Sequence, residues 1–322
     1  MHTPHSARNT TVFFLCIAVF GIVFDVNAVC SIQRSSAPGP ALQISGTAFS
    51  VICSTVKHSK ESGVTEPCSA ADTGVMVLPT AERRGRTATI SAELERADRL
   101  FDRQEYDKAR RLLERLLPSR PNDAEVLWRL SNYAINDGDA VRYGSGDDVA
   151  TRKYYHTAVR YAERAVQADP ENANAHAFLA ASYGSYAMYA GGKEKVKLAN
   201  RIRDELDIAL KLDPRNQVAH TIYGTWHREV ADVSWVERQL ANVFLGGMPD
   251  GSIGKSIYHL QKAIDIAPTV LRHHYELGKT CIAAEKKKEA AQAFRRALQC
   301  PDGWKVDPWR RTRMKEWLRD NT

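Results

Sequence analysis

Few residues in this 322-residue chain are spaced as nucleotide-binding or catalytic groups usually are. The tripeptide Gly254-Lys255-Ser256 resembles the end of a phosphate-binding loop, whose backbone and lysine would hold the phosphates of a nucleotide. That loop needs a glycine five residues before Gly254, where this chain has Pro249, and it needs a preceding strand. Nucleotide binding is therefore not expected.

Metal binding has equally little support in the sequence. His176, His220 and His274 recur at the same place in three successive sequence units, but no cysteine or paired carboxylate accompanies them. A role in helix packing or in lining a groove is favoured for these histidines. The acidic stretch 136–139 lacks the spacing and the final glutamate of a calcium loop.

The remaining catalytic patterns are missing too. The chain has no Gly-x-Ser-x-Gly elbow, no His-Glu-x-x-His pair and no convincing set of nucleophile and base. The sequence thus predicts a protein that is not an enzyme, with no catalytic residue, no metal and no cofactor.

The elements that organise the chain are instead repeated helical units. A proline follows each of five alanine-rich helical stretches, and a new apolar helical stretch begins shortly after it. Since proline cannot continue a helix, each one marks the end of a unit. The prolines are Pro121, Pro170, Pro214, Pro268 and Pro301.

Small residues give the same register independently. The tetratricopeptide repeat places a small residue in its first helix and an alanine early in its second. In the first and last units these are Ala97 with Ala109 and Gly278 with Ala290, twelve residues apart in both cases. The corresponding pairs of the three middle units lie further apart, and the proline spacings grow by the same amounts. The middle pairs are Ser131 with Ala158, Ala180 with Ile202, and Gly224 with Ser256.

These observations predict an all-α, tetratricopeptide-like superhelix with long insertions between paired helices. Small contact residues let two helices approach to about 8–10 Å. One hairpin cannot bury its apolar face alone, so hairpins stack into a curved array with a concave groove. We expect that groove to bind segments of other proteins.

The same region resembles the regulator of microtubule dynamics family, a divergent tetratricopeptide group. The most specific stretch is 231–241, with Trp235 and Arg238, which runs on to Phe244 and Pro249 in the largest insertion. Stretches 90–98, 124–130 and 193–200 add to the resemblance. The resemblance implies a non-enzymatic, microtubule-associated scaffold of the cytoplasm, the spindle or the mitochondrial surface.

The N-terminal part differs from the array in composition. Residues 11–24 are almost entirely apolar, shorter than the roughly 20 residues of a membrane-spanning helix but typical of a signal-peptide core. Val26-Asn27-Ala28 offers a cleavage site, and an uncleaved anchor or an organelle-targeting segment is the alternative. We therefore expect a targeting segment over 1–28, a disordered Ser/Thr/Gly/Pro-rich linker over 29–89, a repeat array over 90–302 and a basic capping helix over 303–322.

Positive charge concentrates at the C-terminal end. The chain carries a net charge of +7, and residues 279–322 hold twelve Lys and Arg against six Asp and Glu. An acidic surface such as tubulin tails or anionic lipid would fit this excess, while a solvated end cap is the plain alternative. Nucleic acid is not expected, because no recognition motif accompanies the charge. The candidate partner-binding cations are Lys286, Lys287, Lys288, Arg310, Arg311 and Arg313.

Large aromatic residues mark the largest insertion. Trp226, Trp235 and Phe244 indicate an extra helix that packs on the array, or else an apolar site for a partner. Trp235 and Arg238 are therefore candidate partner-binding residues.

Three functions remain open at this point. The first is the microtubule-associated scaffold, with tubulin or microtubules and groove-bound proteins as partners. The second is a secreted or periplasmic tetratricopeptide adaptor, exported through the N-terminal segment. The third is a membrane-tethering or lipid-handling module of an organelle, attached through residues 11–24.

Overall fold

The computed structural model describes residues 80–322, and every regular element in that range is a helix. The predicted targeting segment and most of the predicted linker lie outside the described residues. The helices are α2 (Thr80–Asp102), α3 (Tyr106–Leu116), the short 3₁₀ helix η1 (Leu117–Ser119), α4 (Ala124–Gly144), α5 (Asp148–Ala168), α6 (Ala173–Ala187), α7 (Gly192–Leu212), α8 (Gln217–Ala231), α9 (Trp235–Phe244), α10 (Ile253–Ile266), α11 (Leu271–Ala283), α12 (Lys287–Gln299) and α13 (Asp307–Asn321).

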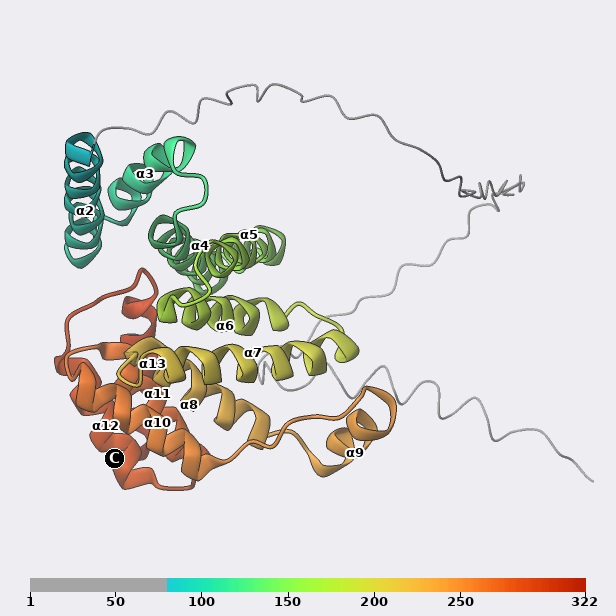
Figure 1. The fold of residues 1–322 in the computed structure, drawn as a ribbon. Helices are drawn as coiled ribbons and strands as arrows, with labels where there is room; N and C mark the ends of the chain where they lie inside the picture. The colour runs from blue at the N-terminus through green and yellow to red at the C-terminus, as the bar shows by residue number, and fades with distance from the viewer. Residues whose placement is uncertain (1–79) are drawn as a thin grey trace, which may run out of the picture.

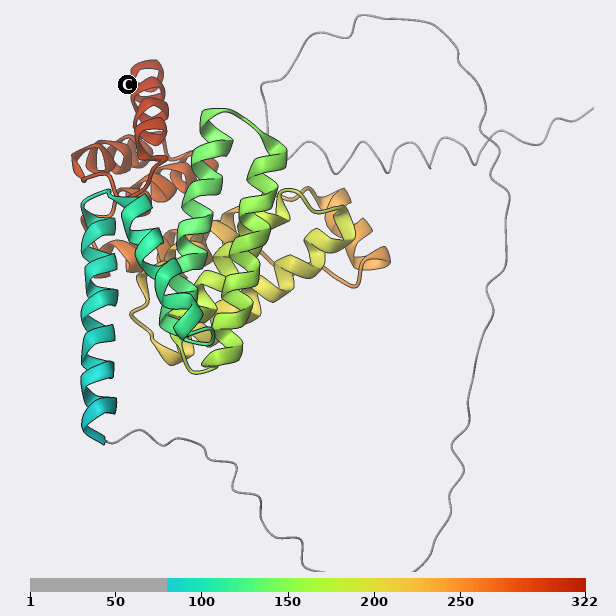
Figure 2. The ribbon, with the colours of Figure 1, turned by 90° about the horizontal axis from the view of Figure 1, so that it is seen from above.

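These helices form five stacked hairpins, which confirms the predicted tetratricopeptide-like array. The pairs are α2 with α3, α4 with α5, α6 with α7, α8 with α10, and α11 with α12, and α13 packs on the last pair. Figure 1 shows the hairpins following one another from the blue-green end to the red end. In Figures 1 and 2 the first and last hairpins lie on the same side of the molecule.

The predicted register of small residues is confirmed at the hairpin contacts. A Cβ added to Gly278 would lie 2.3 Å from the Phe294 ring, and one added to Gly224 would lie 2.5 Å from Leu260. Ser131 and Ala158 are both fully buried. The small residues therefore set how closely the two helices of each unit approach.

The insertions of the middle units are themselves helical. α4, α5 and α7 have 21 residues each, whereas α11 and α12 have 13. The extra residues of the second and third units thus lengthen existing helices, and only the largest insertion forms a separate helix, α9.

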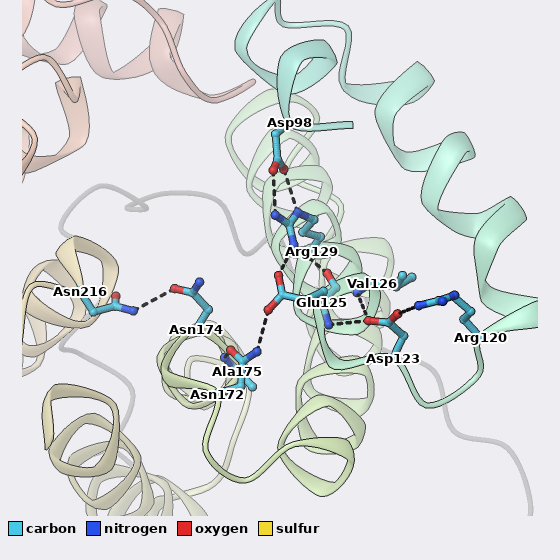
Figure 3. Close-up of polar contacts among 10 residues, drawn as sticks. All are labelled: Asp98, Arg120, Asp123, Glu125, Val126, Arg129, Asn172, Asn174, Ala175 and Asn216. Atoms are coloured by element: carbon cyan, nitrogen blue, oxygen red, sulfur yellow. Dashed lines mark hydrogen bonds and ion pairs between the residues drawn. The ribbon is translucent and has the colours of Figure 1, made fainter. Parts of the chain in front are cut away.

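Polar side chains at the helix starts link each unit to the next. Asn172 and Asn216 cap α6 and α8, since each side chain accepts a backbone N–H of its own helix. Each also donates its amide N–H to the second residue of the preceding unit's first helix: Asn172 to Glu125 at 2.7 Å and Asn216 to Asn174 at 2.9 Å (Figure 3). The same device therefore fixes the step between units twice in succession.

The first unit joins the second through an ion pair. Arg129 of α4 donates two hydrogen bonds to the carboxylate of Asp98 on α2 (2.8 and 2.7 Å), and it also donates to the carboxylate and the backbone carbonyl of Glu125 (Figure 3). Because the Arg–carboxylate fork has a fixed geometry, it sets the orientation as well as the spacing of the two helices.

The three equivalent histidines close the turns between units. Each ring nitrogen Nε2 hydrogen-bonds to the carbonyl of the proline six residues before it: His176 to Pro170 at 2.9 Å, His220 to Pro214 at 3.1 Å and His274 to Pro268 at 2.8 Å. The favoured packing role thus has a specific form, in which the histidine satisfies a carbonyl that the turn leaves free.

The first helix begins earlier than the sequence indicated. α2 starts at Thr80, ten residues before the predicted start of the array at residue 90. Ala, Glu and Arg dominate residues 81–86, and these are good helix formers that can extend the helix on its N-terminal side. Within residues 80–322 no helix combines the length and the apolarity needed to cross a bilayer.

Candidate functional site

The last two hairpins are joined by a buried ion pair between their first helices, α8 and α11. Arg228 of α8 is buried and donates to Glu276 of α11, both to its carboxylate (2.8 Å) and to its backbone carbonyl (3.2 Å). Burial opposes ionisation of Glu276, but Lys279 and Arg228 hold its pKa well below the usual range. The pair therefore stays charged inside the protein.

Residues 302–310, here called the strap, run from the last hairpin back to the first two. The backbone N–H of Lys305 donates to Asn136 of α4 at 2.9 Å, and the Lys305 ammonium pairs with Asp137 (2.6 Å) and Asp107 (3.0 Å). The Gln104 amide donates to the backbone carbonyl of Asp302. One end of the array is thereby tied to the other.

Aromatic rings reinforce the same closure. The Trp304 ring meets Phe101 of α2 edge-on, with centroids 6.5 Å apart, and the Arg272 guanidinium of α11 lies 5.0 Å from the Trp304 centroid. Trp309 packs on Tyr143 of α4 at 4.1 Å. We call the residues that contact the strap from α2, α3, α4 and α11 the inner face: Phe101, Asp107, Asn136, Asp137, Asp139, Tyr143 and Arg272.

The strap has its own internal support. Asp307 is almost fully buried, and its carboxylate accepts the backbone N–H groups of Gly303 (2.8 Å) and Trp304 (2.9 Å) and pairs with Arg310 (2.6 Å). The strap therefore holds a defined shape where it crosses the inner face.

Two of the predicted partner-binding cations, Arg310 and Arg311, form ion pairs within the chain, at or next to the strap. Arg310 is 5% exposed and lies between Asp307 and Asp139 of α4. Arg311 binds Asp302 and the carbonyls of Leu298 and Cys300. Neither guanidinium faces outward, because the carboxylates and carbonyls that surround them lie within the chain itself.

The other predicted cations lie at the surface. Arg313 is exposed and pairs with Glu316. Lys286 ends the turn between α11 and α12, and Lys287 and Lys288 begin α12. All three are exposed and make no ion pair with the described residues. They stand between Glu285 and Glu289, which lower the net positive charge of that turn.

The two predicted residues of the largest insertion have different surroundings. Arg238 donates to the carbonyls of Pro249 and Val230 and so ties α9 to the end of α8. Trp235 is 73% exposed. Trp226, which the sequence grouped with Trp235 and Phe244, is buried in the main core and donates its indole N–H to the backbone carbonyl of Ala199. The predicted extra helix is present, and the three aromatic residues do not form one cluster.

A second basic surface lies on α5 and was not singled out from the sequence. Arg152, Lys153 and Arg160 are exposed, and none of them pairs with a carboxylate of the described chain. With His156 and Tyr186 they line a shallow hollow of about 580 Å³ that has no acidic side chain in its lining. A count of charges along the chain misses this face, because both acidic residues of α5 bind elsewhere: Asp148 accepts from Tyr189 and Glu163 from Tyr183.

Gly254-Lys255-Ser256, the motif that resembled a phosphate-binding loop, takes part in the packing of α10 against α11. Ser256 is fully buried and shares a hydrogen bond of 3.0 Å with Thr280 of α11. Within residues 80–322 no three His, Cys, Asp or Glu side chains are arranged to hold a metal ion.

Known proteins resemble the repeat region closely enough to be compared with it. Residues 93–322 match the family model described as regulator of microtubule dynamics protein 1-3. Regulator of microtubule dynamics protein 1 from Bos taurus is 29% identical over 232 residues, which cover 71% of this chain and 71% of that protein. Regulator of microtubule dynamics protein 2 from Homo sapiens is 25% identical over 188 residues, or 58% of this chain and 45% of that protein.

A solved structure also resembles the array. A thermophilic TPR protein of Thermus thermophilus aligns with a TM-score of 0.48 and 18% identity, over 71% of this chain and 98% of that one.

Proposed function

Since this chain belongs to the family of regulators of microtubule dynamics 1–3, we propose that it is a non-enzymatic, microtubule-associated scaffold. It would act in association with the cytoskeleton, in the cytoplasm, at the spindle or at the mitochondrial surface. Other proteins would bind to the repeat array, and the acidic microtubule surface would bind to cations on its outer helices.

The observation that carries the polymer contact is the α5 face. Its three cations project from a rigid helix, anchored by the buried side chains Tyr155 and Ala158, and no carboxylate of the described chain neutralises them. An acidic partner therefore gains their attraction without first breaking an ion pair. Lys286, Lys287 and Lys288 form a second, weaker contact in this proposal, because two glutamates flank them.

Two charge-reversal variants distinguish the contributions of these two surfaces to microtubule binding. The first variant is Arg152→Glu, Lys153→Glu and Arg160→Glu, and the second is Lys286→Glu, Lys287→Glu and Lys288→Glu. Both change the net charge of the full chain equally, so each is the matched control of the other. With about 0.5 kcal/mol for each exposed charge, the α5 variant loses about tenfold or more in affinity.

Co-sedimentation with microtubules at low ionic strength measures the difference. We expect the α5 variant to bind more weakly than the turn variant, and both to bind more weakly than the unmodified chain. Equal binding by all three proteins would refute an electrostatic contact through these residues. Failure of the unmodified chain to bind would refute the microtubule role itself.

A further inference from the structure

The strap contacts the inner face through a tight turn over residues 304–306 and through the first turn of α13, which begins at Asp307. It presents an aromatic ring, then an ammonium, then a second aromatic ring. Trp304 contacts α2 and α11, Lys305 contacts α3 and α4, and Trp309 contacts α4. These groups come from both ends of an array that is more than two hundred residues long.

We propose that the inner face is a binding site for a turn-forming segment carrying an aromatic residue followed by a basic one, and that the strap occupies this site within the same chain. A partner protein with such a segment would bind after the strap leaves. The existence of that partner rests on the scaffold function proposed above, whereas the occupancy by the strap rests on the contacts alone.

Lys305 is bound through two separate groups, its backbone N–H and its side-chain ammonium. Asn136 accepts its backbone N–H, which any residue except proline offers, while Asp107 and Asp137 bind its side chain. Burial opposes the charge on Lys305, but the hydrogen bonds to Asp137 and Asp107 raise its pKa. Two carboxylates from different units thus converge on one cation, so a basic residue is selected at this position.

Trp304 is held by packing against an aromatic ring and by a cation–π contact. Phe101 covers its edge, the guanidinium of Arg272 lies over its ring, and the residue packs against the main core, which brings it next to the central hairpins. A flat aromatic side chain fits between these neighbours, and an aliphatic one would lose the contact with the guanidinium.

The strap leaves hydrogen-bonding capacity on the inner face unused. The Nδ2 group of Asn136 and the Nε group of Arg272 are buried without a partner in the protein. Burial, and then repulsion from Arg310, lower the pKa of Arg272. Unpaired buried donors cost free energy, so the closed arrangement is not the best one that this face could make. A segment that supplies an acceptor to these donors can therefore compete with the strap.

Competition within one chain has a measurable consequence. Only Cys300 and Pro301 separate the strap from the end of α12, and so short a connection gives the strap a local concentration on the order of millimolar. A free peptide of the same sequence should therefore bind poorly to the unmodified protein and well to a protein whose strap is weakened.

The test uses a fluorescent peptide with the sequence of residues 301–313 and the full chain carrying Trp304→Ala and Lys305→Glu. Fluorescence anisotropy should give at least tenfold tighter binding to this variant than to the unmodified chain. Lys315→Glu is the matched control, since it reverses an exposed charge of α13 outside the strap, and it should bind the peptide as poorly as the unmodified chain.

Two further measurements keep the result interpretable. Circular dichroism establishes whether the double variant remains helical. If it does not, the single variant Lys305→Ala takes its place, and intermediate binding of the peptide is expected. A peptide that carries the two substitutions itself should not bind. No binding of the parent peptide to a folded variant at about 100 μM, or equal binding to the unmodified chain, would overturn the proposal. No microtubules are present, so this outcome is independent of the co-sedimentation result.

Discussion

At the scale of single residues, the structure depends on charges that are buried in pairs. Arg228 and Glu276 are 5% and 6% exposed and lie on two neighbouring units. Removing one partner from such a pair leaves the other charge without compensation in a poorly solvated place, which costs more than the pair itself contributes.

We predict that Arg228→Met lowers the free energy of unfolding by about 3–5 kcal/mol, because the buried Glu276 carboxylate then loses its hydrogen-bonded partner and keeps only the more distant charges of Lys279 and Arg272. Urea unfolding followed by circular dichroism measures this. The double variant Arg228→Met/Glu276→Leu should recover most of the loss, since it removes both charges. A double variant as unstable as the single one would contradict this explanation.

The histidines between α8 and α10 make a second residue-scale prediction. Burial lowers the pKa of His227 and of His259 to about 4 each, and their rings stack with Tyr223. An unfolded histidine has a pKa of about 6.5, so below that pH the unfolded chain binds protons that the folded chain does not. Stability is therefore complete above pH 6.5 and falls between pH 6.5 and 4, by about 1.4 kcal/mol per pH unit for each histidine.

The variant His227→Phe tests this dependence, because it keeps an aromatic ring beside Tyr223 and cannot titrate. Urea unfolding at several pH values between 7 and 4.5 should give a shallower loss of stability for the variant, by about one histidine's share. Parallel curves for the two proteins would show that His227 does not contribute.

At the scale of the helices, close approach within a hairpin decides which glycines can be replaced. Gly278 and Gly184 both lie inside helices, where alanine normally stabilises by about 1 kcal/mol. A Cβ on Gly278 would meet the buried Phe294 ring, whereas one on Gly184 would meet no atom within 4 Å.

We therefore predict opposite effects for one substitution at these two positions. Gly184→Ala should raise the melting temperature, and Gly278→Ala should lower it, because displacing a packed ring costs about 1–3 kcal/mol. Differential scanning calorimetry of the two variants measures both. A stabilising Gly278→Ala would mean that the α11–α12 contact is looser than the structure shows.

The elements also show how far the sequence could be interpreted. Ala97, Ala109, Gly278 and Ala290 predicted the hairpins correctly, because a small residue at a close helix contact is a local requirement that the sequence carries at every unit. The fate of the insertions was not predictable in this way. Whether fifteen extra residues lengthen α4 and α5 or form a loop depends on packing with the next hairpin, and no local pattern records that.

The same limit applies to the candidate sites. Arg310 looked like a surface cation because its partner Asp139 on α4 is 171 positions away in the sequence, and the α4 residue that accepts the backbone N–H of Lys305 is 169 positions away. The α5 face was missed for the converse reason. Its sequence is not unusually basic, and the face becomes basic because Glu163 and Asp148 bind Tyr183 of α6 and Tyr189 of the turn that follows α6.

At the scale of the whole molecule, the strap turns a row of hairpins into a closed arrangement. The strap covers the inner face, so a partner that binds there, as we propose, has access only after the strap leaves. We retain, as proposals, a targeting segment over residues 1–28, a linker over 29–89, a repeat array over 90–302 and a basic capping helix over 303–322.

The central claim, an electrostatic association with microtubules through unpaired outer cations, is tested most directly by an ionic-strength titration of the full chain. Co-sedimentation should show binding at low salt that weakens steadily as salt rises, since exposed charges are screened within about 10 Å at 0.1 M. It should also weaken on polymer whose acidic tails have been removed. Binding that does not change with salt or with tail removal, or no binding at the lowest salt, would contradict the claim.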